Sequence, residues 1–302
     1  MRSSILNYGT KVNSIEAARA ALNYNILKEE IYDADGRPLG NWRGIINSQT
    51  RRCVGVVGHN FTFIQPSETL EIVQRAVEAT GAVWNSVAAF GGGASIIATA
   101  SLPDKKLVAP KRGDAVSVGF SIRDYFDGSG RISGDVFLNV LACTNGAKAR
   151  RGLFNFSKKH TPSLRDVLDG IRFKFAVAVE TAVEDFRGVM TKLDNTPMTQ
   201  AEHDEFTLRL FNVESETALR DGAQTPTRTF NRVEEVRSLF TRGAGNVGRT
   251  RWDSFNAVTE HLDWFSTFRE TEGTSREENR FASLTGGNAA RVRETALELL
   301  LN

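Results

Sequence analysis

The sequence of 302 residues contains only two cysteines, four histidines and no long run of apolar residues. Cys53 and Cys143 are too few for a disulfide framework or a thiolate zinc site, and two thiols suit a reducing cytoplasm. None of the histidines has another at metal-ligand spacing, which excludes a His-rich metal site. No segment approaches the roughly 20 apolar residues of a membrane span, and the first residues lack the apolar run of a signal peptide. We therefore expect a soluble, cytoplasmic protein with no metal, no cofactor and no membrane partner.

Excess charge is also missing, because the net charge is only +2. An argument for a polyanionic partner must therefore rest on where the charges lie. The composition, 40% hydrophobic and 25% charged, is ordinary for a globular chain long enough to bury a core. We divide the chain into an N-terminal arm with one short helix (1–50), a core (51–195) and a helical C-terminal region (196–302).

Alternating apolar residues predict three β-hairpins in the core. In the clearest one, residues 116–122 and 136–140 alternate, and Asp127-Gly128-Ser129-Gly130 supplies the turn. The other two hairpins are predicted at residues 83–102, around Gly91-Gly92-Gly93, and at residues 53–64, around Gly58-His59-Asn60.

Apolar residues at a spacing of three to four predict a long helix from Ser163 to about Val189. Capping signals at Thr199, Asn231 and Ser275 start further helices, and residues 288–301 form the last one. The predicted fold class is α+β: an antiparallel sheet of five or six strands backed by the long helix, with a helical C-terminal half.

A basic loop follows the hairpin at residues 116–140, with no acidic residue between Lys148 and Lys159 and with two phenylalanines inside it. Single-stranded nucleic acid is typically held by cations along its backbone and by rings that stack on its bases. A solvated charged face, with the phenylalanines fixing the loop to the core, explains the same residues. The predicted nucleic-acid-binding residues are Lys148, Arg150, Arg151, Phe154, Phe156, Lys158, Lys159, Arg165 and Arg172, extended by Lys105, Lys106, Lys111 and Arg112.

Two other patterns invite a functional interpretation. The stretch from Gly243 to Gly248 matches G-x-G-x-x-G, but it follows a predicted helix, whereas the dinucleotide fingerprint follows a strand. We interpret it as a flexible basic loop. Further along, Asn256, Glu260, His261 and Asp263 lie close together in sequence. They form either a structural polar network, which we favour, or an acid–base site.

Four stretches together resemble the phage/plasmid-related family of unknown function that occurs on mobile elements. They are Val54–Gly58 with Phe61–Gln65, Gly91–Gly93 with Ala100–Pro103, Val140–Asn145, and Trp252–Glu260. The resemblance spans roughly Val54 to Leu301 and implies a phage or plasmid context, without catalytic residues to transfer. The order of elements alone is similar to the RecT and Redβ single-strand annealing proteins, which implies rings or filaments with a basic groove.

The leading hypothesis is a non-enzymatic, phage- or plasmid-encoded protein in the cytoplasm of a bacterial host. It binds single-stranded nucleic acid, with DNA favoured over RNA, forms a homo-oligomer as a ring or filament, and promotes strand annealing and recombination. The alternative is a non-catalytic assembly protein whose basic loop docks an acidic partner. An enzyme using Glu260, His261 and Asp263 ranks third.

Overall fold

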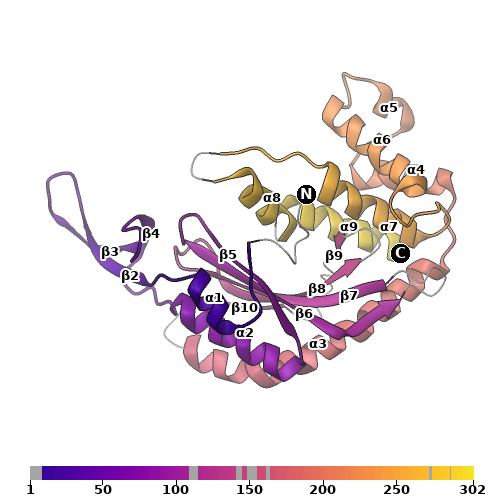
Figure 1. The fold of residues 1–302 in the computed structure, drawn as a ribbon. Coiled ribbons are helices and arrows are strands. Elements are labelled where there is room, and N and C mark those ends of the chain that lie inside the picture. Colours follow the sequence, from indigo (N-terminus) through magenta and orange to yellow (C-terminus); the bar gives the residue numbers. More distant parts are fainter. Residues whose placement is uncertain are drawn as a thin grey trace.

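The computed structural model describes residues 9–108, 115–140, 145–147, 155–160, 164–271, 274–285 and 287–302. Within these ranges, side chains are described except at 104–108, 115–117, 137–140, 145–147, 155–156, 158, 164–176, 178 and 285. The protein has the predicted α+β fold, in which antiparallel sheets are followed by a C-terminal half made of helices (Figure 1).

Within the described residues, the main sheet has seven antiparallel strands in the order β1-β5-β6-β7-β8-β10, with the short β9 also paired to β8. Its core is the two predicted hairpins, 83–102 and 116–140, which are confirmed by the pairing of β5 with β6 and of β7 with β8. The strands are β1 (Thr10–Lys11), β5 (Val83–Phe90), β6 (Ser95–Val108), β7 (Ala115–Tyr125), β8 (Ile132–Val140), β9 (Asn145–Ala147) and β10 (Asn155–Lys158).

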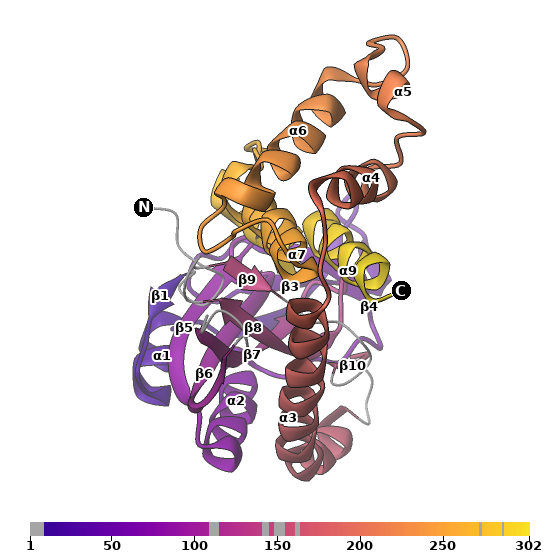
Figure 2. The same cartoon turned by 90° about the vertical axis from the view of Figure 1, so that its right-hand side faces the viewer.

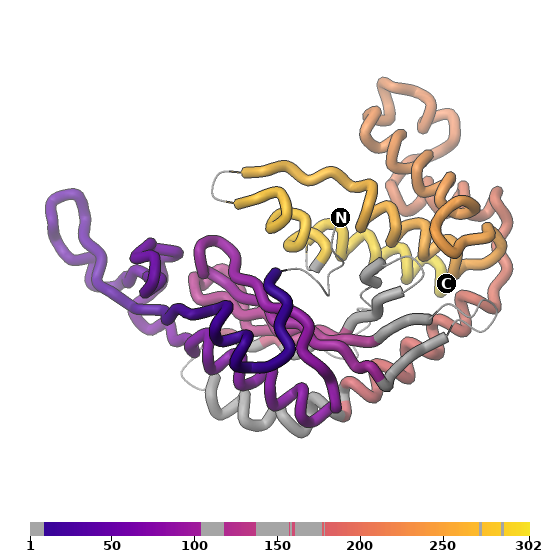
Figure 3. The backbone as a smooth tube through the Cα atoms, viewed as in Figure 1, coloured from indigo at the N-terminus to yellow at the C-terminus, as the bar shows by residue number. Residues whose placement is uncertain are grey.

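A second, three-stranded sheet projects from one end of the molecule (Figures 1 and 3). It consists of β2 (Ile26–Tyr32), β3 (Pro38–Asn47) and β4 (Cys53–Gly58). The predicted hairpin at 53–64 is wrong, because β4 pairs with β3 and residues 61–65 form no strand. The reason is that β2 and β3 form a hairpin within the predicted arm, and the other edge of β3 pairs with β4.

Helices α1 (Ile15–Ala21), α2 (Pro66–Thr80) and α3 (Leu164–Asn195) cover one face of the main sheet (Figure 1). The predicted start and end of α2 are confirmed: Pro66 opens the helix, and Gly81 ends it with a φ of 68°. Leu70 and Val73 on its inner face are fully buried. The long helix α3 packs against α2 and continues to the C-terminal helices, as Figure 2 shows.

The C-terminal helices α7 to α9 lie on the opposite side of the sheet, while α4 to α6 stand further out (Figure 2). The capping box of Thr199 with Glu202 is confirmed, but the predicted start at Asn231 is wrong, because α6 begins four residues earlier, behind Pro226. These helices are α4 (Gln200–Leu210), α5 (Glu216–Arg220), α6 (Thr227–Arg242), α7 (Arg251–Glu260), α8 (Arg276–Thr285) and α9 (Asn288–Leu301).

A single π-helical turn, His261–Phe265, extends α7 without a break. Its closing bond runs from the backbone N–H of Ser266 to the carbonyl oxygen of His261, over 2.9 Å. The Ser266 hydroxyl donates to the same oxygen. Such turns widen a helix by one residue and are frequent at functional sites.

Candidate functional site

The outer edge of β8 is where the structure positions the two ends of the predicted basic loop. Ala147 in β9 is opposite Leu138, and Asn155 in β10 is opposite Asp135. Both short strands run antiparallel to β8, so together they resemble one edge strand interrupted by residues 148–154. Three residues of β8 separate the two anchor points, which corresponds to about 10 Å. The chain therefore leaves and rejoins the sheet at neighbouring points of one edge.

Several of the predicted nucleic-acid-binding residues belong to this edge or follow it directly. Phe156 and Lys158 are in β10, Lys159 is exposed just beyond it, and Arg165 and Arg172 are in the first turns of α3. Lys148, Arg150, Arg151, Phe154, Lys111 and Arg112 lie outside the described residues.

Lys105 and Lys106 are on β6, at the other end of the sheet from β10. Lys106 is opposite Ser117 of β7, whereas Lys158 is opposite Ile132, whose neighbour Ser133 pairs with Arg123 of β7. Six residues of β7 separate Ser117 from Arg123, or about 20 Å. The backbone therefore does not bring these two groups of lysines together.

The end of β10 is fixed to the core by His160. Its Nε2 atom lies 3.0 Å from a carboxylate oxygen of Asp124, and both side chains are buried. Asp124 also accepts a hydrogen bond from the Thr69 hydroxyl, over 2.7 Å, and the ring of Phe61 lies 5.2 Å from the imidazole. This contact holds the His160 side chain in the core. The backbone position of its exposed neighbour Lys159, next to the end of β10, is therefore fixed.

The polar residues of α7 and its π-turn face different neighbours. Asp263 is buried and makes an ion pair of 2.7 Å with Arg293 of α9. Glu260 accepts a hydrogen bond from the backbone of Ala244, and burial raises the pKa of its carboxyl. His261 faces α6, and burial lowers the pKa of its imidazole to about 4. The acid–base site considered from the sequence would need these groups to converge. In the described geometry Asp263 is directed to Arg293, Glu260 to the backbone of Ala244, and His261 to the side of α6.

Asn256 of α7 is fully buried, and neither polar atom of its side chain has a hydrogen-bond partner among the described residues. The helix packs against α3, α6, α9 and β9. The part of the sequence that carries the most specific family resemblance is thus the central helix of the C-terminal region.

Sequence reasoning missed a pair of arginines, Arg228 and Arg232, which line a cavity between α6 and the π-turn. With the helix predicted to start at Asn231, Arg228 was assigned to a loop. The four-residue spacing of the pair therefore did not indicate that both arginines lie on one face of a helix. The sequence signal for the earlier helix start was Pro226, because proline is tolerated at the start of a helix but not in its interior.

Among the described residues, no three His, Cys, Asp or Glu side chains gather into a cluster that could hold a metal ion. Within the same part of the chain, no helix combines the length and apolar character needed to cross a membrane.

The chain shows no significant similarity to any curated protein or solved structure. A family model described as a domain of unknown function, DUF932, matches residues 53–285 and so includes the two hairpins, the long helix and α7. Because this match covers more than three quarters of the 302 residues, the chain belongs to the DUF932 family.

Proposed function

We propose that this protein is a non-enzymatic, phage- or plasmid-encoded protein that binds single-stranded DNA at the outer edge of β8 and promotes strand annealing. The observation that carries the proposal is the pairing of β9 and β10 with the same edge of β8, on either side of residues 148–154. Those residues and the end of β10 form a basic stretch without acidic side chains.

The physical basis is the combination of cations and rings at one place. Arg150, Arg151, Lys158 and Lys159 would neutralise phosphates, and Phe154 or Phe156 would stack on bases. Lys106 lies about 20 Å from Lys158 along the strands, so both would contact the same DNA only if its strand runs along the sheet. We expect the complex to form in the cytoplasm of a bacterial host and to involve several copies of the chain.

The binding test uses fluorescence anisotropy of labelled single-stranded and duplex DNA at about 50 mM and about 200 mM salt. We expect tighter binding to the single strand and a steep loss of affinity with salt, because each neutralised phosphate releases counterions. The double variant Arg150→Ala/Arg151→Ala should flatten the slope of log K against log salt by about 1.4, because each phosphate that an arginine neutralises on a single strand adds about 0.7 to that slope.

The matched control is Arg187→Ala/Arg220→Ala, which removes the same charge from exposed ion pairs with Glu184 and Glu216 in α3 and α5, outside both the edge of β8 and the three-stranded sheet. It should bind DNA like the parent. No binding at low salt, or an Arg150/Arg151 variant with the parental affinity and slope, would overturn the proposal. Annealing of two complementary labelled strands, measured with the same variants, separates strand annealing from simple binding.

The three-stranded sheet supports assembly of several copies. Trp42 and Val56 occupy one face of it, because Val56 is opposite Gly44 and Gly44 is two residues from Trp42. Both side chains are about half exposed, at 52% and 51%. The alternative function, a non-catalytic assembly protein whose basic loop docks an acidic partner, would show no preference for DNA over an acidic peptide.

A further inference from the structure

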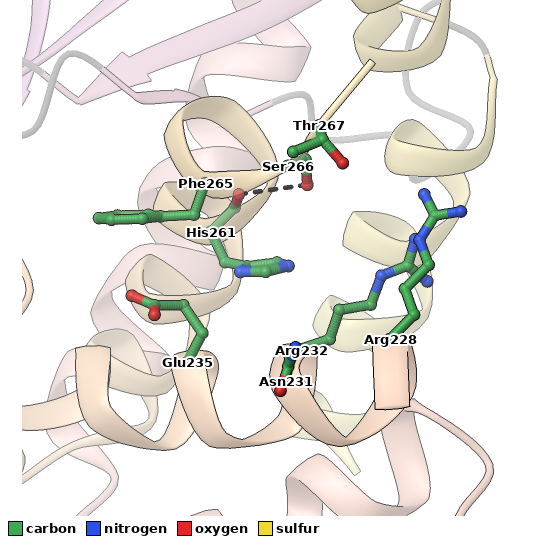
Figure 4. A pocket seen from close by; sticks show the side chains of 8 residues that line it. All are labelled: Arg228, Asn231, Arg232, Glu235, His261, Phe265, Ser266 and Thr267. Atoms are coloured by element: carbon green, nitrogen blue, oxygen red, sulfur yellow. Dashed lines mark hydrogen bonds between the residues drawn. The ribbon is translucent and has the colours of Figure 1, made fainter. Parts of the chain in front are cut away.

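A cavity of about 470 Å³ lies between α6 and the π-turn that extends α7. Figure 4 shows the side chains that line it, among them Arg228, Arg232 and Glu235 from α6, and His261, Phe265 and Ser266 from the π-turn and its end. Binding sites for small molecules are typically 300–1,000 Å³ in volume. A second cavity of about 180 Å³ adjoins the first, and the two share Arg228, Arg232, His261, Ser266 and Thr267.

The two arginines of the cavity are unlike the others of α6. Arg237 pairs with Glu216 and Glu234, and Arg242 pairs with Glu235. Neither Arg228 nor Arg232 makes an ion pair with a described residue. They are one helical turn apart, and burial together with the charge of Arg228 lowers the pKa of Arg232. Two guanidinium groups that repel each other at the wall of a cavity are stabilised by an anion between them.

His261 supplies the second observation. Its side chain is only 5% exposed, faces the cavity, and has no hydrogen-bond partner at Nδ1 among the described residues. Burial, followed by the charge of Arg232, lowers its pKa to about 4, so the imidazole is neutral at physiological pH. A buried neutral imidazole without a partner costs free energy unless a ligand satisfies it. The π-turn, which carries His261 at its first residue, is itself a common feature of functional sites.

The opposite end of the cavity has a different character. The ring of Phe265 is 47% exposed there, and it lies on the far side of His261 from the arginines (Figure 4). Glu235 is close to this end, with its charge held by Arg242 over 2.9 Å. A ligand with an anionic group at one end and a flat ring at the other matches this arrangement. The carboxylate of Glu235 repels an anionic group from the Phe265 end, whereas the phenyl ring of Phe265 can stack on a planar ring there.

We propose that this cavity binds a small organic phosphate of mononucleotide size, with its phosphate between Arg228 and Arg232 and its flat ring against Phe265. His261 then forms a hydrogen bond, as donor or acceptor, with the part of the ligand between the phosphate and the ring. This site is separate from the outer edge of β8, so it adds a small-molecule ligand to a protein for which we propose DNA binding.

Calorimetric titration of the full chain with AMP, adenosine and inorganic phosphate tests the site. We expect saturable binding of AMP, with affinities at least about tenfold lower for adenosine and for inorganic phosphate, because each lacks half of the contacts. Arg228→Gln/Arg232→Gln should weaken AMP by at least about tenfold, since hydrogen bonds to charged groups are the strongest of the set. Phe265→Ala should weaken AMP while leaving inorganic phosphate unchanged.

The matched control is Arg187→Gln/Arg220→Gln, which removes two exposed arginines that pair with Glu184 and Glu216 and do not line the cavity. It should bind AMP like the parent, and thermal melts should show that all variants fold. Absence of saturable AMP binding, or an Arg228/Arg232 variant with parental affinity, would overturn the proposal.

A 5′-phosphorylated oligonucleotide and its unphosphorylated form distinguish a free nucleotide from a strand end. AMP that competes with neither places a free nucleotide in the cavity, whereas AMP that displaces only the phosphorylated form assigns the cavity to the end of a DNA strand. Arg150→Ala/Arg151→Ala should retain AMP binding, so failure of the DNA proposal and failure of this one give different results.

Discussion

His203 is fully buried where α4, α6 and α7 meet. Its Nδ1 atom lies 2.8 Å from the Ser254 hydroxyl and its Nε2 atom 3.2 Å from the carbonyl oxygen of Val236. The ring stacks on Phe240 with centroids 4.2 Å apart. A neutral imidazole satisfies this site, with Nε2–H donating to the carbonyl and Nδ1 accepting from the hydroxyl. Burial lowers the pKa of His203 to about 4.

This lowered pKa predicts acid sensitivity. The unfolded chain gains a proton on His203 below about pH 6.5, whereas the folded chain resists it down to about 4. The contribution of His203 to the free energy of unfolding is therefore fully present above about pH 6.5 and decreases as the pH falls below that value. About 2 kcal/mol of it is lost by pH 5. Urea unfolding at pH 7 and pH 5 should show a smaller loss for His203→Gln than for the parent. His59→Gln, in an exposed turn, serves as the control and should lose as much as the parent; an equal loss in all three proteins would contradict the assignment.

At the scale of elements, Asp253 organises both the start of α7 and the loop before it. Its carboxylate accepts hydrogen bonds from the backbone N–H groups of Val247, Arg249 and Thr250, at 2.9–3.1 Å. Asn246 adds two bonds, from its side-chain amide to Leu239 and Asp253 carbonyls. The glycine-containing stretch that resembles a nucleotide fingerprint is thus a loop held by a buried cap. In the described geometry, the loop that we predicted to be flexible is held by these side-chain hydrogen bonds.

Asp253→Ala should destabilise the protein by at least about 2 kcal/mol, because each buried amide left without an acceptor costs about 1–3 kcal/mol. The capping box of α4 offers a matched control: Glu202 has the same position relative to Thr199 but is exposed, so water can replace it. Glu202→Ala should cost clearly less. Chemical denaturation measures both, and equal losses would show that burial of the cap does not matter.

The elements themselves follow largely from local sequence. Alternation predicted the four central strands, and Gly93 shows why the turn between β5 and β6 needs glycine: its φ is 103°, and a Cβ atom would approach Asn47 to 2.6 Å. The errors arose where two local signals competed. Asn231 with Glu234 resembles a capping box, yet it lies inside α6, because Pro226 had already started the helix.

At the scale of the whole molecule, the three-stranded sheet extends from the body (Figure 3). Trp42 and Val56 are exposed on one face of this sheet. Gly55 of β4 is where this sheet meets the body, since a Cβ atom there would approach Asp127 to 2.6 Å. An exposed apolar face on a projecting sheet is typical of contacts between subunits.

If this face joins copies of the chain, Trp42→Glu should convert the oligomer to a monomer in size-exclusion chromatography with light scattering. The thermal stability of the monomer should change little, because the side chain is already half exposed. Val247→Glu adds the same charge at a position that is 57% exposed in the helical region, and it should leave the oligomer intact. A monomeric parent, or an unchanged mass for Trp42→Glu, would contradict the prediction.

The sequence by itself determined the α+β class, the two central hairpins, the long helix and most helix starts, because period, caps and turn residues act within a few positions along the chain. Only the tertiary structure decided that β4 pairs with β3, that Lys106 lies about 20 Å along the sheet from Lys158, and that α6 and the π-turn enclose a cavity. Each of these depends on contacts between residues far apart in sequence. The local sequence pattern does not determine which strand pairs with a sheet edge or where two helices enclose a cavity. Both depend on how the whole chain packs.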